Sequence, residues 1–307
     1  SVYHHLSEPV RRMLHGRVAQ ALADGGGDQT RALERSVREV DDEVAGRIAY
    51  HLERSLDPHR AAPFLAQAAR AAMDVYAHES AIDYYQRTLA LLTRDEDRAS
   101  VMVDLAHAQH VTGRWADVEE LYRRGIALAK EAGVPRVEAR AWHLVAEAQE
   151  SRGAYRLALT SAGKAEEAAR AAGEQGREAL AGALHRKGWA LFRLGDSENA
   201  LSHAQEALAL SRVIGDWKAQ ADSLNLLSAI HNDAGEHEEA RSCMEEALAL
   251  FREAGYRRGE AVMLGNLGNT AYLQGAYAQA AERYREGLAL AREIGHRYTE
   301  MLCLNNL

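Results

Sequence analysis

Glycine recurs along this chain at an almost constant interval, and this regularity restricts the fold more than any other feature. Successive members of one column are 40, 42, 40 and 40 residues apart: Gly113, Gly153, Gly195, Gly235 and Gly275. A second column follows each of these by 20 residues: Gly133, Gly173, Gly215, Gly255 and Gly295. A fixed period of about 20–50 residues is the sequence signature of a repeat architecture, in which each repeat packs on its neighbours.

Small and large side chains keep a constant distance from the first glycine column. Small residues stand seven positions before it and twelve after it: Ala106, Ala146, Gly188, Ser228 and Gly268, then Gly125, Ala165, Ala207, Ala247 and Gly287. Five positions after it the residues are again small or slender: Val118, Ala158, Ala200, Ala240 and Ala280. Eleven positions before it they are large and apolar: Met102, Trp142, Leu184, Leu224 and Leu264. Small residues on one helical stripe let two helices approach closely, so the columns predict a packed helix pair in each repeat.

Charged residues mark the second turn of each repeat. Lysine or arginine stands three positions before the second glycine, where a helix C-terminus favours positive charge, and in four of five repeats an acidic residue follows. Glycine is itself common where a helix ends in a left-handed residue. With four prolines in 307 residues, little interrupts such helices. Each repeat is predicted as helix A, a turn at the first glycine, helix B and a turn at the second, which makes an all-α fold.

The repeats extend beyond these five at both ends. Tyr76 occupies the glycine position of an earlier, divergent repeat, with Ala69 and Ala81 in its small-residue columns. At the other end, residues 301–307 match residues 261–267. We count six repeats over residues 61–307 and the start of a seventh. Because the sequence stops inside a helix A, we expect it to be a fragment of a longer chain.

The first 60 residues follow a different pattern. An apolar stripe from Leu6 to Leu22 predicts one helix, and Gly25 to Gly27 predict a flexible loop. A second helix is expected over Val40–Ser55, because the proline at position 58 stops it. We therefore predict a helical lead-in over residues 1–60 and a repeat domain over residues 61–307.

The fullest repeat resembles a known family. The spacing of Gly268, Gly275, Ala280, Tyr284 and Gly287 resembles the tetratricopeptide repeat, with a period of about 40 residues in place of the usual ~34. The resemblance implies a right-handed superhelical solenoid of antiparallel helix pairs, with a concave groove lined mainly by the A helices.

The lead-in adds a second resemblance. Its segments at residues 11–19 and 48–55, together with residues 84–89, resemble the stretch that joins the ATPase core to the repeat sensor in the STAND class of signal-transduction ATPases. That family implies repeats that hold the ATPase inactive until a ligand binds.

The composition indicates which kinds of partner and which cellular compartment are expected. The net charge of −8 argues against nucleic acid as a partner, and no run approaches the roughly 20 apolar residues that cross a bilayer. Cys243 and Cys303 match no disulfide or metal spacing, which favours a reducing compartment. We expect a cytoplasmic protein with no nucleic-acid or membrane partner.

The sequence offers no motif for catalysis. The phosphate-binding pattern G-x-x-x-x-G-K-[ST] is absent, and Gly25 to Gly27 lack its lysine. The pair His107 and His110 has no third metal ligand nearby, and His231, His237 and Cys243 lie across a turn. We predict no catalytic residue, no metal and no cofactor. The alternative, a helical hydrolase or metal enzyme, is open to metal analysis and activity assays.

The A helices carry an unusual set of side chains ten, six and three residues before the first glycine column, positions that the repeat register turns toward the groove. Amide, imidazole and aromatic groups outnumber the Lys, Glu and Arg of a solvated face. Asparagine can donate to and accept from a peptide backbone, and aromatic rings offer a broad contact. The predicted ligand site, here called the A row, comprises His107, His110, His143, Glu147, His185, Trp189, Phe192, Asn225, Asn232, Asn269, Tyr272 and Asn305, together with Asn266, which lies next to the row position Gly265; Val103, Glu150, Ala229 and Gly265 occupy equivalent positions.

These observations predict a non-enzymatic sensor. It would bind a peptide or protein ligand in the groove and, through autoinhibitory contacts, keep the ATPase core of its own full-length chain inactive. One alternative is a free-standing adaptor that links two proteins. A structural alternative for the A row is that its residues only bridge neighbouring A helices.

Overall fold

The computed structural model describes residues 7–23 and 42–307, and within these the regular structure is helical throughout. Its α-helices are α1 (Glu8–Ala23), α2 (Asp42–Glu53), α3 (Ala62–Asp74), α4 (His78–Leu91), α5 (Asp95–Val111), α6 (Trp115–Glu131), α7 (Pro135–Ser151), α8 (Tyr155–Ala171), α9 (Arg177–Arg193), α10 (Ser197–Ile214), α11 (Trp217–Asp233), α12 (His237–Glu253), α13 (Arg257–Leu273), α14 (Tyr277–Glu293) and α15 (Arg297–Asn306). Short 3-10 helices cover Pro58–Ala61 and Gly173–Gly176. The predicted all-α fold is confirmed.

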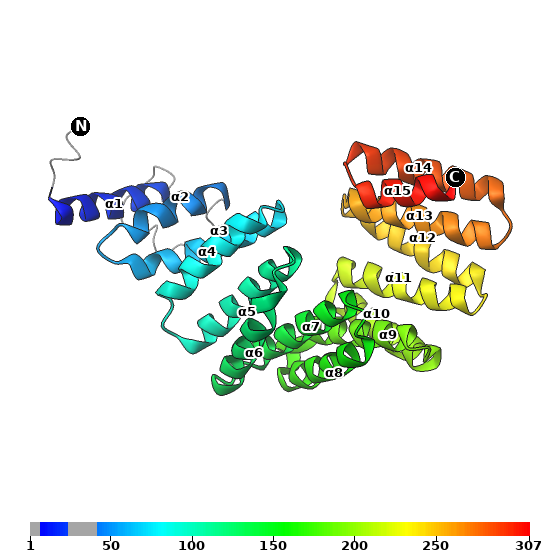
Figure 1. Cartoon of the computed structure of the whole chain (residues 1–307), viewed down its shortest axis with the longest axis horizontal. Coiled ribbons are helices and arrows are strands. Elements are labelled where there is room, and N and C mark those ends of the chain that lie inside the picture. The colour runs from blue at the N-terminus through cyan, green and yellow to red at the C-terminus, as the bar shows by residue number, and fades with distance from the viewer. Residues whose placement is uncertain (1–6, 24–41) are drawn as a thin grey trace. The chain divides into compact units, whose positions relative to one another are not determined.

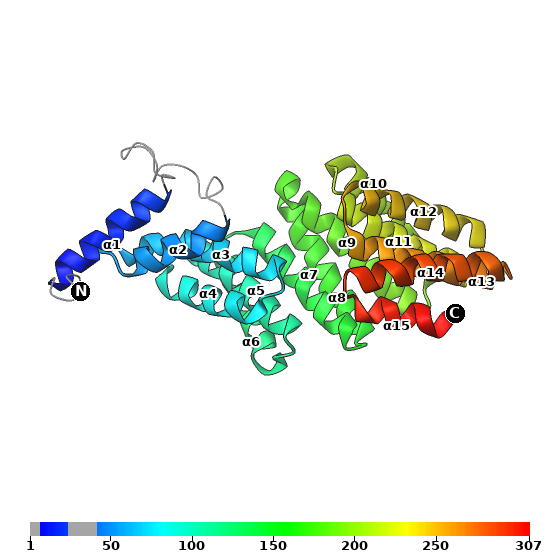
Figure 2. The ribbon, with the colours of Figure 1, turned by 90° about the horizontal axis from the view of Figure 1, so that it is seen from above.

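Consecutive helices pack as antiparallel pairs, as Figures 1 and 2 show for α3 with α4 and for α13 with α14. The odd-numbered helices α5 to α15 are the predicted A helices, and α6 to α14 are the predicted B helices. The structure therefore confirms a solenoid of helix pairs.

Two compact units make up the packing, residues 1–141 and residues 142–307. We call them the N-terminal and the C-terminal unit and describe each by itself. In the N-terminal unit, α1 and α2 confirm the two lead-in helices, although α2 ends at Glu53, before the predicted end at Ser55. The glycine loop predicted at Gly25 to Gly27 lies outside the described residues, and the predicted division at residue 60 stays a prediction.

The turns follow the glycine columns. Every glycine of both columns has a positive φ, between 59° and 85°. Tyr76 has a φ of 60° and is the one residue other than glycine with a positive φ in the described part of the chain. A left-handed residue closes each helix by letting the next backbone N–H groups reach back to its last carbonyls. The register that placed Tyr76 in the glycine column is thus confirmed.

The small-residue columns form the contact between paired helices. Ala106, Ala146, Ala200 and Ala240 are fully buried. A Cβ on Gly268 would lie 2.6 Å from the Tyr284 ring, so α13 and α14 approach too closely there for any side chain. The prediction that these columns let helices pack closely is confirmed.

In three of the repeats, the basic and acidic residues of the charged columns form ion pairs with each other. Lys130 pairs with Glu138 at 3.2 Å, Arg252 with Glu260 at 3.0 Å and Arg292 with Glu300 at 2.8 Å. Each pair joins the last turn of a B helix to the first turns of the next A helix. These bonds reinforce the turns at the second glycine column.

Candidate functional site

The A row is divided between the two units. His107 and His110 of α5 belong to the N-terminal unit, where His107 is half-buried and His110 is buried. Val103, one helical turn before His107, is fully buried against Gly125 of α6 and belongs to the core. The other predicted residues lie in the C-terminal unit, on α7, α9, α11, α13 and α15.

Three charged side chains join α7 to α9. Arg186 of α9 donates to Glu150 Oε2 and to Glu147 Oε2, each at 2.8 Å. The Glu150 side chain is 7% exposed and the Glu147 side chain 35%. Burial raises the pKa of Glu150 to about 7, against the opposing effect of Arg186. Two carboxylates here share a single guanidinium, and Glu150 Oε1 and Arg186 Nε are buried without a partner.

Two histidines lie beside this ion cluster. The His143 ring of α7 packs against Gly182 of α9, where an added Cβ would lie 3.0 Å from the ring. His185 lies next to Arg186. Burial first, and then the positive charge of Arg186, lowers the pKa of His185 from 6.5 to about 3. His185 is therefore neutral at neutral pH.

Trp189 and Phe192 supply the aromatic part of the row. Their ring centroids are 5.8 Å apart with the planes tilted by 38°, and both side chains are half-buried. Both pack on the core cluster that contains Leu226 and Leu227. Each ring is thus held against the core by part of its surface, and the rest of it stays accessible for contact.

The asparagines form hydrogen bonds between neighbouring A helices. Asn266 Nδ2 of α13 donates to Asn225 Oδ1 of α11 at 3.2 Å. Asn232 Nδ2 donates to the Thr270 hydroxyl at 3.0 Å. Bridging between A helices, the structural alternative for these residues, therefore does occur. It orients the amides, because Asn225 gives its oxygen to α13 and keeps its NH₂ group for another acceptor.

A second hydrogen bond between asparagine side chains joins α13 to α15. Asn306 Nδ2 donates to Asn269 Oδ1 at 3.0 Å, and the Tyr284 hydroxyl donates to the same oxygen at 2.7 Å. The NH₂ group of Asn269 is again left for another acceptor. The two oriented NH₂ groups, on α11 and α13, are donors of the kind that peptide carbonyls require.

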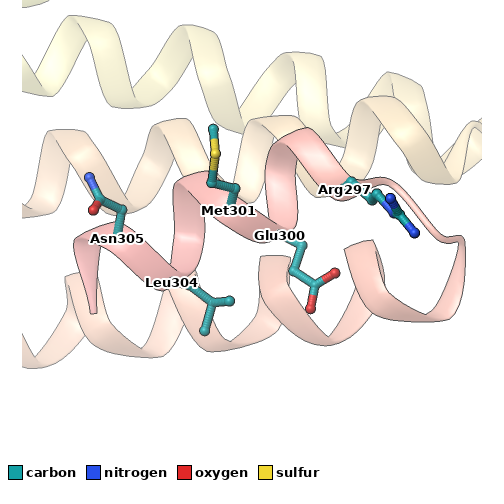
Figure 3. A pocket seen from close by; sticks show the side chains of 5 residues that line it. All are labelled: Arg297, Glu300, Met301, Leu304 and Asn305. Carbon is teal, nitrogen blue, oxygen red and sulfur yellow. The ribbon is translucent and has the colours of Figure 1, made fainter.

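Tyr272 and Asn305 lie at the more exposed end of the row. Tyr272 is 57% exposed and forms an edge-on contact with Tyr277, with ring centroids 5.5 Å apart. Asn305 lines a shallow hollow on α15 together with Arg297, Glu300, Met301 and Leu304, which Figure 3 shows along the helix. Met301 and Leu304 are exposed, while the matching Ala261 and Leu264 of α13 are buried.

Sequence reasoning missed Arg186, Thr270 and Asn306. Arg186 could have been found from the sequence, because it directly follows His185 of the A row and because the preceding repeat has acidic residues, Glu147 and Glu150, at its row positions. Thr270 and Asn306 are partners of predicted asparagines, and their roles depend on the offset between adjacent helices. That offset is a property of packing and is not encoded in any single repeat.

The described residues contain no group of three or more His, Cys, Asp or Glu side chains arranged to hold a metal ion. None of the helices in the described ranges is both long and apolar enough to cross a membrane.

Comparisons identify what this arrangement is similar to. Residues 219–293 match a family model described as tetratricopeptide repeat, and residues 181–213 match another of the same description. No curated protein matches the sequence.

Solved structures share the fold at low sequence identity. A Rap protein complexed with Competence and Sporulation Factor aligns with a TM-score of 0.65 and 13% identity, covering 98% of this chain and 96% of that one. A STAND protein with a tetratricopeptide repeat sensor from Pyrococcus horikoshii gives 0.61 and 18%, covering 98% of this chain and 53% of that one. The apo quorum sensor NprR from B. thuringiensis gives 0.61 and 13%, covering 89% and 83%.

Proposed function

Because this chain carries tetratricopeptide repeats, we propose that it is a non-enzymatic binding module that takes up an extended peptide on the A row of its C-terminal unit. The observation that carries the proposal is the orientation of the row's amides. Asn225 and Asn269 each give an oxygen to the next A helix, which leaves their NH₂ groups for ligand carbonyls. Trp189 and Phe192 lie on the neighbouring A helix as an apolar contact for a side chain.

Preorganisation explains why these residues suit binding. An asparagine that is already held by a helix-to-helix hydrogen bond loses little conformational freedom when it binds a ligand. A tryptophan held on the core likewise presents a large surface at low entropic expense. The Rap protein in the comparison was solved with Competence and Sporulation Factor bound, which supports ligand capture by a fold of this kind.

A phage-displayed library of random peptides, selected against the immobilised chain, tests the proposal. Selected peptides should bind at least about tenfold more weakly to the Trp189→Ala and Asn269→Ala variants, since each removes a central contact. Leu157→Ala, which removes an exposed apolar side chain from the B helix α8, is the matched control and should bind normally. Unchanged binding by both row variants would contradict the assignment.

We further propose that the module is the sensor of a larger regulatory ATPase of the STAND class. The lead-in segments that resemble that class support this, as does the likeness to the sensor-bearing STAND protein, of which this chain spans about half the length. Capture of a peptide would favour one arrangement of the repeats and so weaken contacts that keep the ATPase inactive. ATP hydrolysis by the full-length protein should then rise when a selected peptide is added.

A free-standing adaptor is the second candidate. The chain covers 96% of the Rap chain with which it aligns, so folds of this length occur as whole chains among its structural neighbours. An adaptor would bind the selected peptide with no accompanying change in nucleotide hydrolysis. The ATPase measurement on the full-length protein therefore separates the two candidates.

A further inference from the structure

Two exposed tyrosines lie in contact at the turn between α13 and α14. Tyr272 is in the last turn of α13 and Tyr277 is the first residue of α14, and each is more than half exposed. Their ring centroids are 5.5 Å apart and the ring planes meet at 63°. We call these two residues the tyrosine pair. Because Tyr272 belongs to the A row, the pair adds an accessible apolar surface to the end of the row.

The same two positions form a polar contact in the preceding repeat. Asn232 and His237 stand there, three residues before Gly235 and two after it, and His237 Nδ1 lies 3.2 Å from Asn232 Oδ1. The turn therefore brings these positions together in both repeats. Since a hydrogen-bonded pair closes the turn of one repeat, the fold does not require two exposed aromatic rings in the next.

Asn269, one helical turn before Tyr272, offers a ligand donors but no acceptor. Its Oδ1 accepts from Asn306 Nδ2 at 3.0 Å and from the Tyr284 hydroxyl at 2.7 Å. An amide oxygen has two lone pairs, so both are engaged, while Nδ2 keeps its two N–H groups for the ligand. A peptide residue opposite Asn269 therefore finds a partner on this side chain for its carbonyl and none for its N–H.

Proline is the residue that matches both features. It has a carbonyl but no N–H, and its fixed φ of about −65° suits an extended backbone. Its ring is apolar, and grooves lined by aromatic side chains are a recurring way to bind proline in an extended peptide.

The two features lie close enough to act on one ligand residue. Asn269 and Tyr272 are three residues apart on one face of α13, a spacing that sets Cβ atoms about 5–6 Å from each other. From this geometry we infer that Asn269 and the tyrosine pair form a subsite for one proline of the bound peptide. This inference rests on the proposed function and adds a residue that the ligand carries.

Two phage-displayed libraries of random peptides, identical except that one lacks proline, start the test. Peptides selected from the complete library should share a proline at one fixed position. The best peptides from the proline-free library should bind about tenfold more weakly, as expected when a buried apolar ring is missing.

A pair of substitutions, one in the peptide and one in the protein, assigns the preference to the tyrosine pair. Replacing the fixed proline by alanine should weaken binding to the wild-type chain about tenfold, because alanine removes the ring and adds an N–H without a partner. The same replacement should weaken binding to the Tyr272→Ser, Tyr277→Ser double variant less than about threefold, because the rings that contact proline are gone.

Two control variants complete the test. The Tyr272→Phe, Tyr277→Phe double variant keeps both rings and should retain the tenfold effect of proline. Tyr298→Ser removes a similarly exposed tyrosine from the start of α15 and should retain it too. Circular dichroism and urea midpoints show whether each variant is folded, and the single Tyr272→Ser variant replaces the double variant if that one is unfolded.

The outcomes separate this inference from the proposed function. Selected peptides without a fixed proline, or a proline effect that is equal in wild type and the serine variant, overturn the subsite and leave peptide binding intact. A selection that yields no binding peptide overturns both proposals. A fixed proline whose effect depends on the tyrosine pair supports both.

Discussion

Tyr76 adopts the turn geometry of the repeats although this backbone conformation is unfavourable for a residue other than glycine. It ends α3 in the left-handed conformation that glycine adopts in every later repeat. For a residue with a Cβ, this conformation is less favourable by about 1–2 kcal/mol. Tyr76→Gly should therefore raise the free energy of unfolding by about 1 kcal/mol, measured by urea denaturation.

The control for that prediction is another exposed tyrosine with ordinary helical φ. Tyr277, in the first turn of α14, is 65% exposed, and its replacement by glycine should lower stability by about 0.5–1 kcal/mol. Equal effects of the two substitutions would show that the conformation of Tyr76 carries no strain.

Gly268 and Gly163 test the close approach of paired helices. Both lie inside helices, where alanine is normally better than glycine by about 1 kcal/mol. A Cβ on Gly268 would meet the Tyr284 ring at 2.6 Å, while a Cβ on Gly163 would meet nothing within 4 Å. Gly268→Ala should destabilise the chain by about 1–3 kcal/mol through overpacking, and Gly163→Ala should stabilise it. Two shifts of the urea midpoint in the same direction would contradict the packing model.

At the residue scale, the sequence predicted positions better than it predicted partners. The register identified Trp189, Asn225 and Asn269 because the face of a helical residue follows from its distance to the turn glycine. It could not show that Asn266 reaches Asn225, because that contact depends on how far α13 is displaced along α11. Val103 shows a second limit of predicting from the register, because it stands at a row position but its side chain packs into the core.

The contact between α7 and α9 is an element-scale feature with a pH signature. The pKa of Glu150 rises from 4.5 to about 7 on folding, so between these pH values the folded state binds the proton more tightly than the unfolded state. The contribution of Glu150 to stability is therefore present below pH 4.5 and is lost as the pH rises to about 7. Relative to wild type, Glu150→Gln should gain roughly 1–3 kcal/mol in unfolding free energy between pH 4.5 and 8.

The effect of His185 on the pH dependence of stability should have the opposite sign. Its pKa falls from 6.5 to about 3, so the unfolded state binds the proton more tightly and acid lowers stability below pH 6.5. The two effects oppose each other between pH 4.5 and 6.5 in the wild type. His185→Gln should therefore gain stability relative to wild type as the pH falls, in urea titrations across that range. Parallel pH profiles of wild type and both variants would show that neither group is perturbed.

The helix boundaries of the regular repeats were predicted most accurately, because each depends on residues that are close together in the sequence. Each boundary in the regular repeats is set by a glycine with positive φ, and that requirement is visible in the sequence. The lead-in has no such columns, so the end of α2 was predicted at Ser55, whereas the helix ends at Glu53. The ion pairs between Arg252 and Glu260 and between Arg292 and Glu300 were not predicted, although both columns were recognised, because their distance depends on the turn between the helices.

At the scale of the whole molecule, stability should differ along the chain. In a repeat array each helix is held by its neighbours, and α1 buries one residue, Ala19, whereas α9 buries Leu184 and several small residues. Amide hydrogen exchange should therefore be roughly 100-fold faster in α1 than in α9. Mass spectrometry of the native chain measures this directly, and equal protection of the two helices would contradict it.

The central claim is that an extended peptide binds along the A row of the C-terminal unit. The most direct test is to place a photoreactive benzophenone in a library-selected peptide and to identify the crosslinked residues by mass spectrometry. The account predicts crosslinks on α9, α11 and α13, near Trp189, Asn225 and Asn269. Crosslinks confined to the B helices α10, α12 and α14, or to the N-terminal unit, would contradict it.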